Sequence, residues 1–524
     1  MNRNIDFSKT YLGIEFGSTR IKAILIDDKY KAIASGSHDW ENRFENGYWT
    51  YSLDDIHNGM KKCYESLRED ISEKYNTYPT SFGAIGISAM MHGYMAFNDE
   101  GHLLTPFRTW RNTTTKQAAD ELTELFGFNI PQRWSIAHLY QAMLNGEEHV
   151  KEISYITTLA GYIHYLLTGR LEVGIGEASG MFPVRNGAYD AEMLDKFNNI
   201  AKESGYKWRL EEILPKIRTA GQKGAFLTEA GAELLDSSGK LCGMISICPP
   251  EGDAGTGMTA TNSVRCNTGN VSAGTSVFAM LVLENNLKNV HHEIDIVTTP
   301  QGDPVAMVHC NNCCGELDSW VNMFGEFAQL SGLDINKSDL YELLYKQALK
   351  GDDDCGGITA YNYISGEHIV GIENGKPMYF RTQNSKLNLS NFIRAQLYSS
   401  IASLKYGMDI LFDSENVKAS KFIAHGGLFK VKGVAQLILA NALNTPVCVT
   451  ENSGEGGAYG MALLAAYMQK GNKLSLADWL ENDVFSGAES IVAKPQIDGT
   501  KGFCEYMCRH KAGIEAEKML EVIE

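Results

Sequence analysis

The feature that most constrains the fold of this chain is a hairpin pattern that occurs twice. "GIEFGSTRIKAILI" contains an apolar strand, a turn of small residues at Gly17-Ser18-Thr19, and a second apolar strand. "NVSAGTSVFAMLVL" repeats this arrangement around Gly274-Thr275-Ser276, about half of the 524-residue chain further on. One such hairpin near the start of each half indicates a duplicated domain, and 524 residues exceed what one hydrophobic core usually holds. We therefore expect two domains, residues 1–264 and 265–524.

Each half mixes short apolar runs with amphipathic helical patterns. In the first half, residues 82–90 and 94–99 are typical of strands, and residues 52–70 have helical periodicity with Ser52 as the N-cap. In the second half, residues 421–468 alternate strand, helix, strand and helix, an order that requires parallel pairing. The predicted fold class is α/β.

The two turns also predict a chemistry. Gly, Ser and Thr expose backbone N–H groups without a bulky side chain over them, and such a concavity suits phosphate oxygens. An isolated turn of this kind is more often structural, but two matching turns in duplicated domains favour phosphate binding. Between them, "CPPEGDAGTGMTA" places Asp253 in a Gly-rich segment just before the second hairpin. We interpret Asp253 as a general base; the alternative is an Asp that caps the following helix.

Charge and composition exclude several classes of partner. The formal net charge of −17 argues against nucleic acid and against an anionic membrane surface. No apolar run reaches the length of a membrane span, and the N-terminus lacks the apolar core of a signal peptide. Eleven scattered cysteines fit reduced thiols in a cytoplasmic protein.

Two other motifs leave alternatives open. A zinc site is one interpretation of a cysteine cluster formed by Cys310, Cys313, Cys314, Cys504, Cys508 and His510, although buried free thiols are favoured over it because the paired C-x2-C spacing is missing. "GEGGAYG" (454–460) is similar to a dinucleotide loop but lacks the G-x-G-x-x-G spacing, so an NAD-dependent oxidoreductase is a weaker alternative. No P-loop motif occurs.

The motifs together resemble those of the FGGY carbohydrate kinases, in the actin, hexokinase and Hsp70 ATPase superfamily. "GIEFGSTRIKAILID" looks like the first phosphate motif of the family, "EGDAGTGM" like the loop with the catalytic base, and "VSAGTS" like the second phosphate motif. "IAHGGLFKVKGVAQLILANALNTPV" resembles the adenosine motif, and "ENSGEGGAYGMALLAA" the closing helix. "SAMMHGYMAF" is similar to the Met-His-Gly segment of xylulokinases.

The resemblance implies two ribonuclease-H-like domains with βββαβα cores and a cleft between them. The sugar would bind chiefly to the first domain and ATP to the second, and Asp253 would accept a proton from the attacking sugar hydroxyl. Glu15 and Asp253 would bind Mg²⁺ through water. The residues implied for ATP are Gly17, Ser18, Thr19, Arg20, Gly274, Thr275, Ser276, Gly426, Gly427, Gln436 and Gly456. Those implied for the sugar are Met91, His92, Trp110, Arg111 and Asn112.

The sequence departs from the family pattern in several places, among them Arg20, which falls where small residues are common, and the second FGGY signature, which is not recognisable. Glu15 stands where the family usually has Asp, and Trp110-Arg111-Asn112 replaces a Trp-Asn-Asp segment. The expected activity is ATP-dependent phosphorylation of a ketopentose, with xylulose first; ribulose, fuculose and erythritol are alternative acceptors. A non-kinase ATP-binding switch of the same superfamily is the competing hypothesis. The expected partners are the sugar and ATP, and a second copy of the chain is a candidate partner.

Overall fold

The computed structural model describes residues 5–450, 456–471, 473–487 and 490–520, which divide into two compact units. The first unit comprises Met1–Val264, Ile296–Val305 and Glu455–Ser486. The second unit comprises Arg265–Asp295, Ala306–Gly454 and Gly487–Glu524. The change of unit after Val264 lies at the expected boundary, but two later segments group with the first unit. The longer of them does so because its helix packs on the first sheet, as shown below.

The first unit contains a central sheet, several short strand pairs and most of the helices. Its strands are β1 (Tyr11–Phe16), β2 (Arg20–Ile26), β3 (Ala32–Asp39), β4 (Arg43–Glu45), β5 (Tyr48–Thr50), β6 (Ala84–Ala89), β7 (Met95–Phe97), β8 (Tyr155–Thr157), β9 (Glu172–Gly174), β10 (Val184–Arg185), β11 (Ala188–Tyr189), β12 (Lys216–Arg218), β13 (Ala225–Phe226), β14 (Ser246–Ile247) and β15 (Glu251–Gly252). Its helices are α1 (Leu53–Tyr75), α2 (Lys116–Phe126), α3 (Ser135–Leu144), α4 (Leu159–Thr168), α5 (Ile175–Ser179), α6 (Ala191–Glu203), α7 (Leu210–Ile213), α8 (Glu229–Leu235), α9 (Asp253–Ala260), α14 (Gly456–Gln469) and α15 (Leu476–Trp479).

The central sheet of the first unit has the strand order β13-β14-β6-β1-β2-β3, with β15 also paired to β6. β1 and β2 form the predicted antiparallel hairpin, and β6 lies parallel to β1 on its other side. β15 is parallel to β6 as well. The carboxyl ends of β1, β6 and β15 therefore meet at one edge of the sheet, which is where ligands usually bind in parallel sheets.

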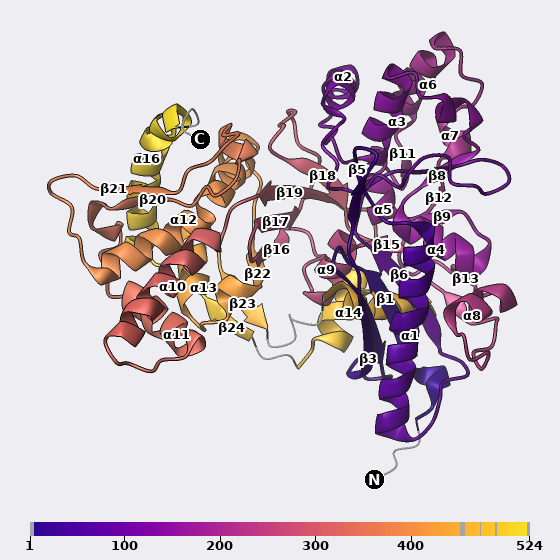
Figure 1. The fold of residues 1–524 in the computed structure, drawn as a ribbon, viewed down its shortest axis with the longest axis horizontal. Coiled ribbons are helices and arrows are strands. Elements are labelled where there is room, and N and C mark those ends of the chain that lie inside the picture. The colour runs from indigo at the N-terminus through magenta and orange to yellow at the C-terminus, as the bar shows by residue number, and fades with distance from the viewer. Residues whose placement is uncertain (1–4, 451–455, 472, 488–489, 521–524) are drawn as a thin grey trace. The chain divides into compact units, whose positions relative to one another are not determined.

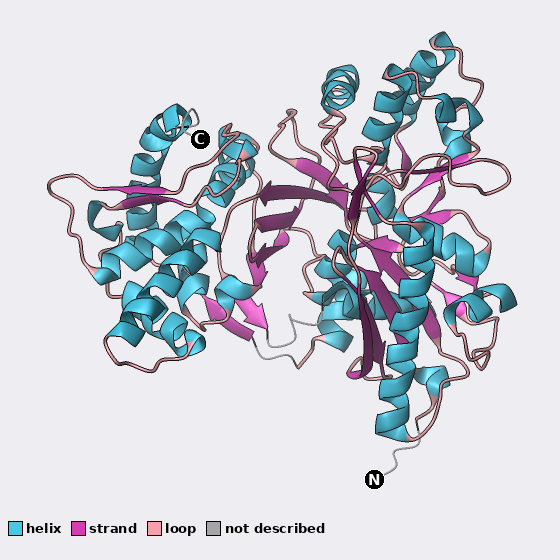
Figure 2. Cartoon of the chain, in the orientation of Figure 1, coloured by secondary structure: helices cyan, strands magenta, loops and turns pink. Residues whose placement is uncertain are grey.

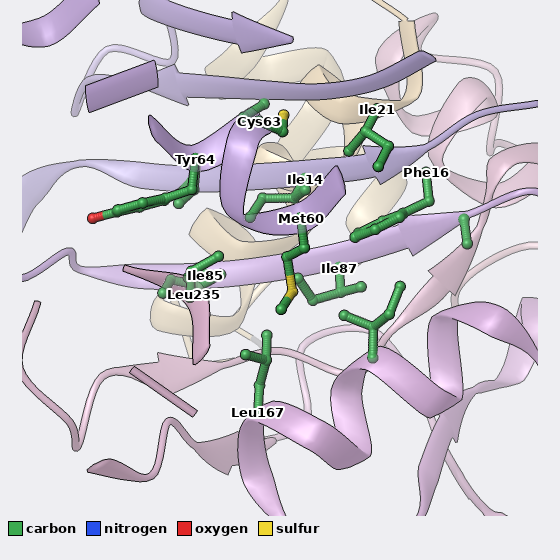
Figure 3. Packing of buried hydrophobic residues seen from close by; sticks show 14 of the residues in the cluster. Ile14, Phe16, Ile21, Met60, Cys63, Tyr64, Ile85, Ile87, Leu167 and Leu235 are labelled. Atoms are coloured by element: carbon green, nitrogen blue, oxygen red, sulfur yellow. The ribbon is translucent and has the colours of Figure 1, made fainter. Parts of the chain in front are cut away.

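Side chains alternate between the two faces of the sheet along β1, and different helices cover these two faces. Ile14 and Phe16 point into a core that also contains Met60 of α1, Ile87 of β6 and Leu167 of α4 (Figure 3). This core buries the apolar side of α1, whose N-cap is Ser52 as predicted: the Asp55 N–H donates to Ser52 Oγ at 3.1 Å.

The opposite face of the sheet is covered by α14, which packs on β1, β6 and β2 (Figure 1). A Cβ on Gly13 would lie 2.1 Å from the carbonyl oxygen of Ala458, and one on Gly86 would lie 2.7 Å from Met461 Cε. Only glycine at these positions lets the helix approach so closely. This packing explains why α14 belongs to the first unit, although its sequence position lies deep in the second half.

The second unit repeats the mixture of helices and strands (Figure 2). Its strands are β16 (Thr268–Ala273), β17 (Val277–Val282), β19 (Pro304–Cys310), β20 (Thr359–Tyr361), β21 (Met378–Phe380), β22 (Lys421–His425), β23 (Val447–Thr450) and β24 (Ser490–Ala493), and β18 (Asp295–Thr298) starts at the end of one of its segments. Its helices are α10 (Gly315–Leu330), α11 (Lys337–Ala348), α12 (Leu389–Asp409), α13 (Val434–Leu443) and α16 (Ile497–Leu520).

The core pairing of the second sheet is the same as that of the first. β16 and β17 form an antiparallel hairpin, and β22 lies parallel to β16 and to β23. The order β22-β16-β17-β19 therefore corresponds to β6-β1-β2-β3. This correspondence confirms the mixed α/β fold class and the repeated hairpin. In the described part of the chain, no helix is both long and apolar enough to cross a membrane.

Candidate active site

Glu15 lies near the end of β1, in a row of polar residues across the first sheet. Its Cα is paired with Lys22 of β2 on one side and with Ser88 of β6 on the other. Glu251 of β15 is paired with Ser88 in turn. Because paired residues point to the same face, these side chains share the α14 face of the sheet.

The first turn of α14 surrounds the carboxylate of Glu15. The N–H groups of Gly457 and Ala458 donate to it, and a Cβ on Gly457 would lie only 2.2 Å from Glu15 Oε1. Burial, followed by the negative charge of Asp253, raises the pKa of Glu15 to about 7, against the opposing effects of Lys22 and the two N–H groups. The extra methylene of Glu15 is thus accommodated by a glycine that leaves room for it.

Asp253 is the first residue of α9, so the Gly-rich segment is a helix rather than the loop that the sequence suggested. The Met91 N–H donates to Asp253 Oδ1 at 3.1 Å. The side chain is exposed, yet the protein around it raises the pKa of its carboxyl by desolvation, while the N–H groups and Arg133 act in the opposite direction. Solvent can reach this carboxylate, and its raised pKa increases its affinity for a proton; both properties suit a general base.

The Met-His-Gly segment forms a tight turn beside Asp253. His92 has a φ of 73°, in the left-handed region that non-glycine residues seldom adopt, and Gly93 follows with 89°. The His92 ring is buried, stacks near Trp134 with ring centroids 6.3 Å apart, and lies 3.3 Å from the Gly180 carbonyl oxygen through Nδ1. Burial, and then the charge of Arg133, hold the pKa of His92 well below its usual range, so the ring is neutral.

Two buried carboxyl groups lie near Asp253. Glu177 of α5 and Glu251 of β15 are 0% and 2% exposed. Burial raises the pKa of Glu251 to about 8, and burial together with the charges of Glu251 and Asp253 raises the pKa of Glu177 well above its usual value. Glycines make the room, because a Cβ on Gly176 would lie 2.1 Å from Glu251 Oε1, and one on Gly252 would lie 2.5 Å from Glu177 Oε2.

The first turn, at Gly17-Ser18-Thr19, is held by hydrogen bonds from aromatic side chains. The Trp40 indole N–H donates to the Gly17 carbonyl at 2.7 Å, and the Tyr51 hydroxyl donates to the Ser18 carbonyl at 2.6 Å. The Gly17 N–H closes the turn on the Arg20 carbonyl at 3.1 Å, so this N–H is already used. Arg20 itself pairs with Asp39 across the strands at 2.5 Å and is half exposed.

The Trp-Arg-Asn segment meets this first turn. The indole N–H of Trp110, which is 38% exposed, donates to Ser18 Oγ at 3.1 Å. Arg111 lies over the Trp49 ring at 4.0 Å and donates to Asn42 Oδ1 at 3.0 Å.

Asn112, by contrast, has a structural role, because its side chain binds backbone groups. It is 2% exposed, and its amide pairs with both backbone groups of Trp49, at 2.8 and 2.9 Å, and donates to the Thr109 carbonyl at 3.0 Å. Both amide hydrogens are therefore used within the protein.

The second turn, at Gly274-Thr275-Ser276, is held by backbone donors. The N–H groups of Cys314 and Cys313 donate to the carbonyls of Gly274 and Thr275 at 3.0 and 2.9 Å. The Gly274 N–H donates to the Ser276 carbonyl at 2.9 Å, and Thr275 is exposed.

The other nucleotide residues expected in the second unit lie after β22. Gly426 has a φ of 102°, and a Cβ there would lie 2.3 Å from the Ala273 carbonyl oxygen, whereas a Cβ on Gly427 would meet open space. Gln436 is buried at the start of α13, where its Oε1 accepts the Gly433 N–H at 2.8 Å. Its position is therefore that of a helix cap, not of an exposed helix glutamine.

Gly456, predicted to contact ATP, is the first residue of α14 and lies in the first unit beside Glu15. The first two residues of "GEGGAYG" lie outside the described residues, and the other five belong to α14. The described part of this motif is therefore helical and contains no dinucleotide-binding loop. Among the described residues, no three His, Cys, Asp or Glu side chains are grouped so that they could hold a metal ion directly, so the structure gives the zinc interpretation of the cysteine cluster no support. No disulfide joins any cysteine of the described residues.

Sequence reasoning missed several residues of this site. The aromatic donors Trp40 and Tyr51, the helix start at Gly457, and the buried acids Glu177 and Glu251 all come together through tertiary contacts. The only local signal was the unusual "EGD" tripeptide, in which a glutamate precedes the Gly-Asp pair.

Comparisons with known proteins agree with this architecture. The FGGY family of carbohydrate kinases matches the chain with its N-terminal domain over residues 10–237 and with its C-terminal domain over residues 269–469. The xylulose kinase of Haemophilus influenzae is 23% identical over 480 residues, which cover 87% of this chain and 90% of that protein.

Two solved structures from Lactobacillus acidophilus have the same fold. A ligand-bound xylulose kinase has a TM-score of 0.76 and a gluconate kinase one of 0.75, each with 17% identity over 98% of this chain and 99% of that structure. At this identity the likeness shows the fold, and the near-equal scores do not favour one sugar. The family matches extend over both units, and the resemblance in the motifs is confirmed. The chain therefore belongs to the FGGY family of carbohydrate kinases, and it is a sugar kinase.

Proposed function

We propose that the protein transfers the γ-phosphoryl group of ATP to a hydroxyl of a ketopentose, with xylulose as the first candidate and Asp253 as the general base. The observation that carries this proposal is the carboxylate of Asp253 at the start of α9, exposed and oriented by the Met91 N–H at 3.1 Å. The xylulose kinase of Haemophilus influenzae supports the choice of sugar.

In the proposed reaction, Asp253 accepts the proton of the sugar hydroxyl while that oxygen attacks the γ-phosphorus. The new P–O bond to the sugar forms as the bond to the β,γ-bridging oxygen breaks, and ADP leaves. The raised pKa of the Asp253 carboxyl, caused by desolvation, increases its affinity for the proton. The Met91 N–H keeps the carboxylate oriented during the transfer.

The residues of the first unit fit Mg²⁺ bound through water. Glu15 and Asp253 are close enough for the charge of Asp253 to raise the pKa of Glu15, and a divalent cation would relieve this repulsion. Glu15 and Asp253 would hold the ion, and it would supply charge neutralisation on the phosphate oxygens. Glu15, fixed by the N–H groups of Gly457 and Ala458, would orient the bound water.

The second unit supplies the residues that we propose for the nucleotide. The Gly274-Thr275-Ser276 turn would bind phosphate oxygens, and the glycines after β22 would let the nucleoside lie against backbone. Gly426 supports this role, because the chain there passes so close to β16 that no side chain fits. Gln436 would contribute indirectly, by fixing the start of α13.

The sugar is proposed to contact Met91, His92 and the exposed face of Trp110. His92 is neutral and buried, and because its Nδ1 lies against the Gly180 carbonyl oxygen and carries the hydrogen, its Nε2 would accept a hydrogen bond from a sugar hydroxyl. Arg111 is exposed beside Trp49 and can reach a sugar or phosphate oxygen, whereas the amide hydrogens of Asn112 already have partners.

The deciding experiment is a substrate panel assayed by ADP release, with xylulose, ribulose, fuculose, erythritol and gluconate at equal concentrations. We expect xylulose to stimulate ADP release most strongly. We expect Asp253→Ala to reduce the stimulated rate by about 10²–10⁴-fold, with nucleotide affinity unchanged by calorimetry. ATP hydrolysis that no acceptor stimulates would contradict a kinase of these sugars and favour an ATP-binding switch, and near-normal turnover in Asp253→Ala would remove the base assignment.

A further inference from the structure

Three aromatic side chains converge on the first turn, and we call Trp40, Tyr51 and Trp110 the aromatic clamp. The Trp40 indole donates to the Gly17 carbonyl at 2.7 Å, the Tyr51 hydroxyl to the Ser18 carbonyl at 2.6 Å, and the Trp110 indole to Ser18 Oγ at 3.1 Å. The Trp40 backbone N–H also donates to the Thr19 carbonyl at 3.1 Å. The carbonyls of all three turn residues are thus bound by the protein.

These bonds fix the direction of the N–H groups as well. In a trans peptide, the carbonyl of one residue and the N–H of the next lie in one plane and point in opposite directions. Binding the Gly17 carbonyl to Trp40 therefore turns the Ser18 N–H away from the clamp, and binding the Ser18 carbonyl to Tyr51 does the same for the Thr19 N–H. Within the described part of the chain, neither N–H has a hydrogen-bond partner.

The Ser18 hydroxyl is oriented by the same arrangement. A hydroxyl has one hydrogen to donate and two lone pairs to accept with. Because Ser18 Oγ accepts the Trp110 N–H, its own hydrogen is available to another acceptor. The turn therefore offers two N–H groups and one O–H, a donor set that suits the oxygens of a phosphate.

Packing holds two members of the clamp, Trp40 and Tyr51, in place. Trp40 and Tyr51 are 7% and 1% exposed, and their rings stack with centroids 4.1 Å apart at an angle of 24°. Phe16 packs on Trp40 and Phe107 on Tyr51. Burial raises the pKa of Tyr51 to about 12, so its hydroxyl keeps its proton and stays a donor at neutral pH.

We propose that the aromatic clamp is a positioning device that presents the first turn to the anionic end of the nucleotide, with Trp110 linking the sugar-binding segment to it. This inference rests on the proposed kinase function. Trp110 then has two roles, since its indole N–H fixes Ser18 while its exposed face remains open to the sugar. Sugar bound against Trp110 would thereby stabilise the phosphate-binding form of the turn.

The test is a pair of variants that each remove one donor. Tyr51→Phe removes a single oxygen and keeps the stacked ring, and Trp110→Phe removes the indole N–H at an exposed position. In each variant we expect the KM for ATP to rise about 3–10-fold, which is the equivalent of one lost hydrogen bond. In Tyr51→Phe the KM for the sugar should change by less than twofold. The dissociation constant of a non-hydrolysable ATP analogue should weaken by a similar factor, and the two changes should be non-additive when combined.

The matched control is Tyr140→Phe, because the Tyr140 hydroxyl donates at 2.7 Å to Glu121, outside the first turn. It should leave both KM values unchanged. An unchanged affinity for the analogue in Tyr51→Phe, at a melting temperature equal to that of the wild type, would overturn the inference. So would a Trp110→Phe variant that alters the KM for the sugar alone. Both results leave the kinase proposal intact, whereas a wild-type protein that releases no ADP with any acceptor overturns that proposal first.

Discussion

The two hairpin turns are equivalent in topology but are held by different chemistry. In the first unit, the carbonyls of Gly17 and Ser18 accept hydrogen bonds from Trp40 and Tyr51 side chains. In the second unit, the carbonyls of Gly274 and Thr275 accept them from the backbone of Cys314 and Cys313. Both solutions direct the following N–H groups away from the donors. The first turn therefore depends on the identity of side chains and the second turn on the path of the backbone, so substitutions should affect the two turns differently.

The largest effect is expected where the second turn depends on backbone geometry. Gly426 has a φ of 102° and its Cβ would lie 2.3 Å from the Ala273 oxygen, so Gly426→Ala should destabilise the second unit by about 3 kcal/mol or more. Urea denaturation measures this. Gly427→Ala is the matched control, since a Cβ there meets open space. Equal stability of the two variants would show that the backbone path is not the constraint.

A comparable effect is expected from the buried acids of the first unit, but only at higher pH. Burial raises the pKa of Glu251 from its ordinary value of 4.5 to about 8, so between these two pH values the folded protein keeps a proton that the unfolded chain has released. Stability should therefore fall as the pH rises through this window. Glu251→Gln removes the part of this dependence that comes from Glu251 and should gain about 2–4 kcal/mol relative to the wild type between pH 5 and pH 8.

Denaturation at the two pH values, with the exposed Glu203→Gln as control, measures this gain. A constant difference between wild type and Glu251→Gln across the range would mean that Glu251 stays charged in the folded protein. The buried position would then need a cation partner.

A smaller effect is expected from weakening the first turn. Trp40→Phe removes the donor to Gly17 and some buried volume, and should cost about 1–2 kcal/mol of stability while raising the KM for ATP several-fold. Trp208→Phe is the matched control, because its indole donates to the Val150 carbonyl at 2.9 Å, outside the turn. If both variants raise the KM for ATP equally, the effect on the nucleotide comes from general destabilisation.

The smallest effect is expected in the second turn when a side chain is changed. Cys314→Ala leaves the backbone N–H that binds Gly274 in place, so the KM for ATP should stay within twofold and stability should fall by about 1 kcal/mol or less. Kinetics with xylulose and a thermal melt measure both. A large rise in the KM for ATP would show that the Cys314 thiol, and not only its backbone, supports the turn.

Much of the fold was predictable because its determinants are local. The two hairpins, the helix that starts after Ser52, and the parallel strands β22 and β23 follow from period, caps and turn residues. The expected continuous second domain differs from the observed units for a non-local reason. The helix α14 packs where Gly13 and Gly86 leave the first sheet bare, and nothing in its own sequence shows this.

The candidate site was predictable only in part. Asp253 and the residues of the two turns were singled out from their motifs, and the structure gives each of them a definite geometry. The amide of Asn112 is used by backbone groups, and the side chain of Gln436 caps a helix, because polar groups in the interior must find hydrogen-bond partners. A motif assigns a residue to a place in the chain, whereas burial decides which of its polar atoms remain available.

The sequence by itself determined the duplicated α/β architecture, the small turns and the acidic residue of the Gly-Asp segment, since these depend on neighbours along the chain. Only the tertiary structure decided which atoms form hydrogen bonds with the turns and which groups surround the acidic side chains. Trp40, Tyr51 and Trp110 meet one turn from three separate segments, and Glu15 meets the start of α14 more than 400 residues further on. The physical reason is that hydrogen bonds and desolvation depend on distance in space, which strand pairing and helix packing set and which sequence separation does not.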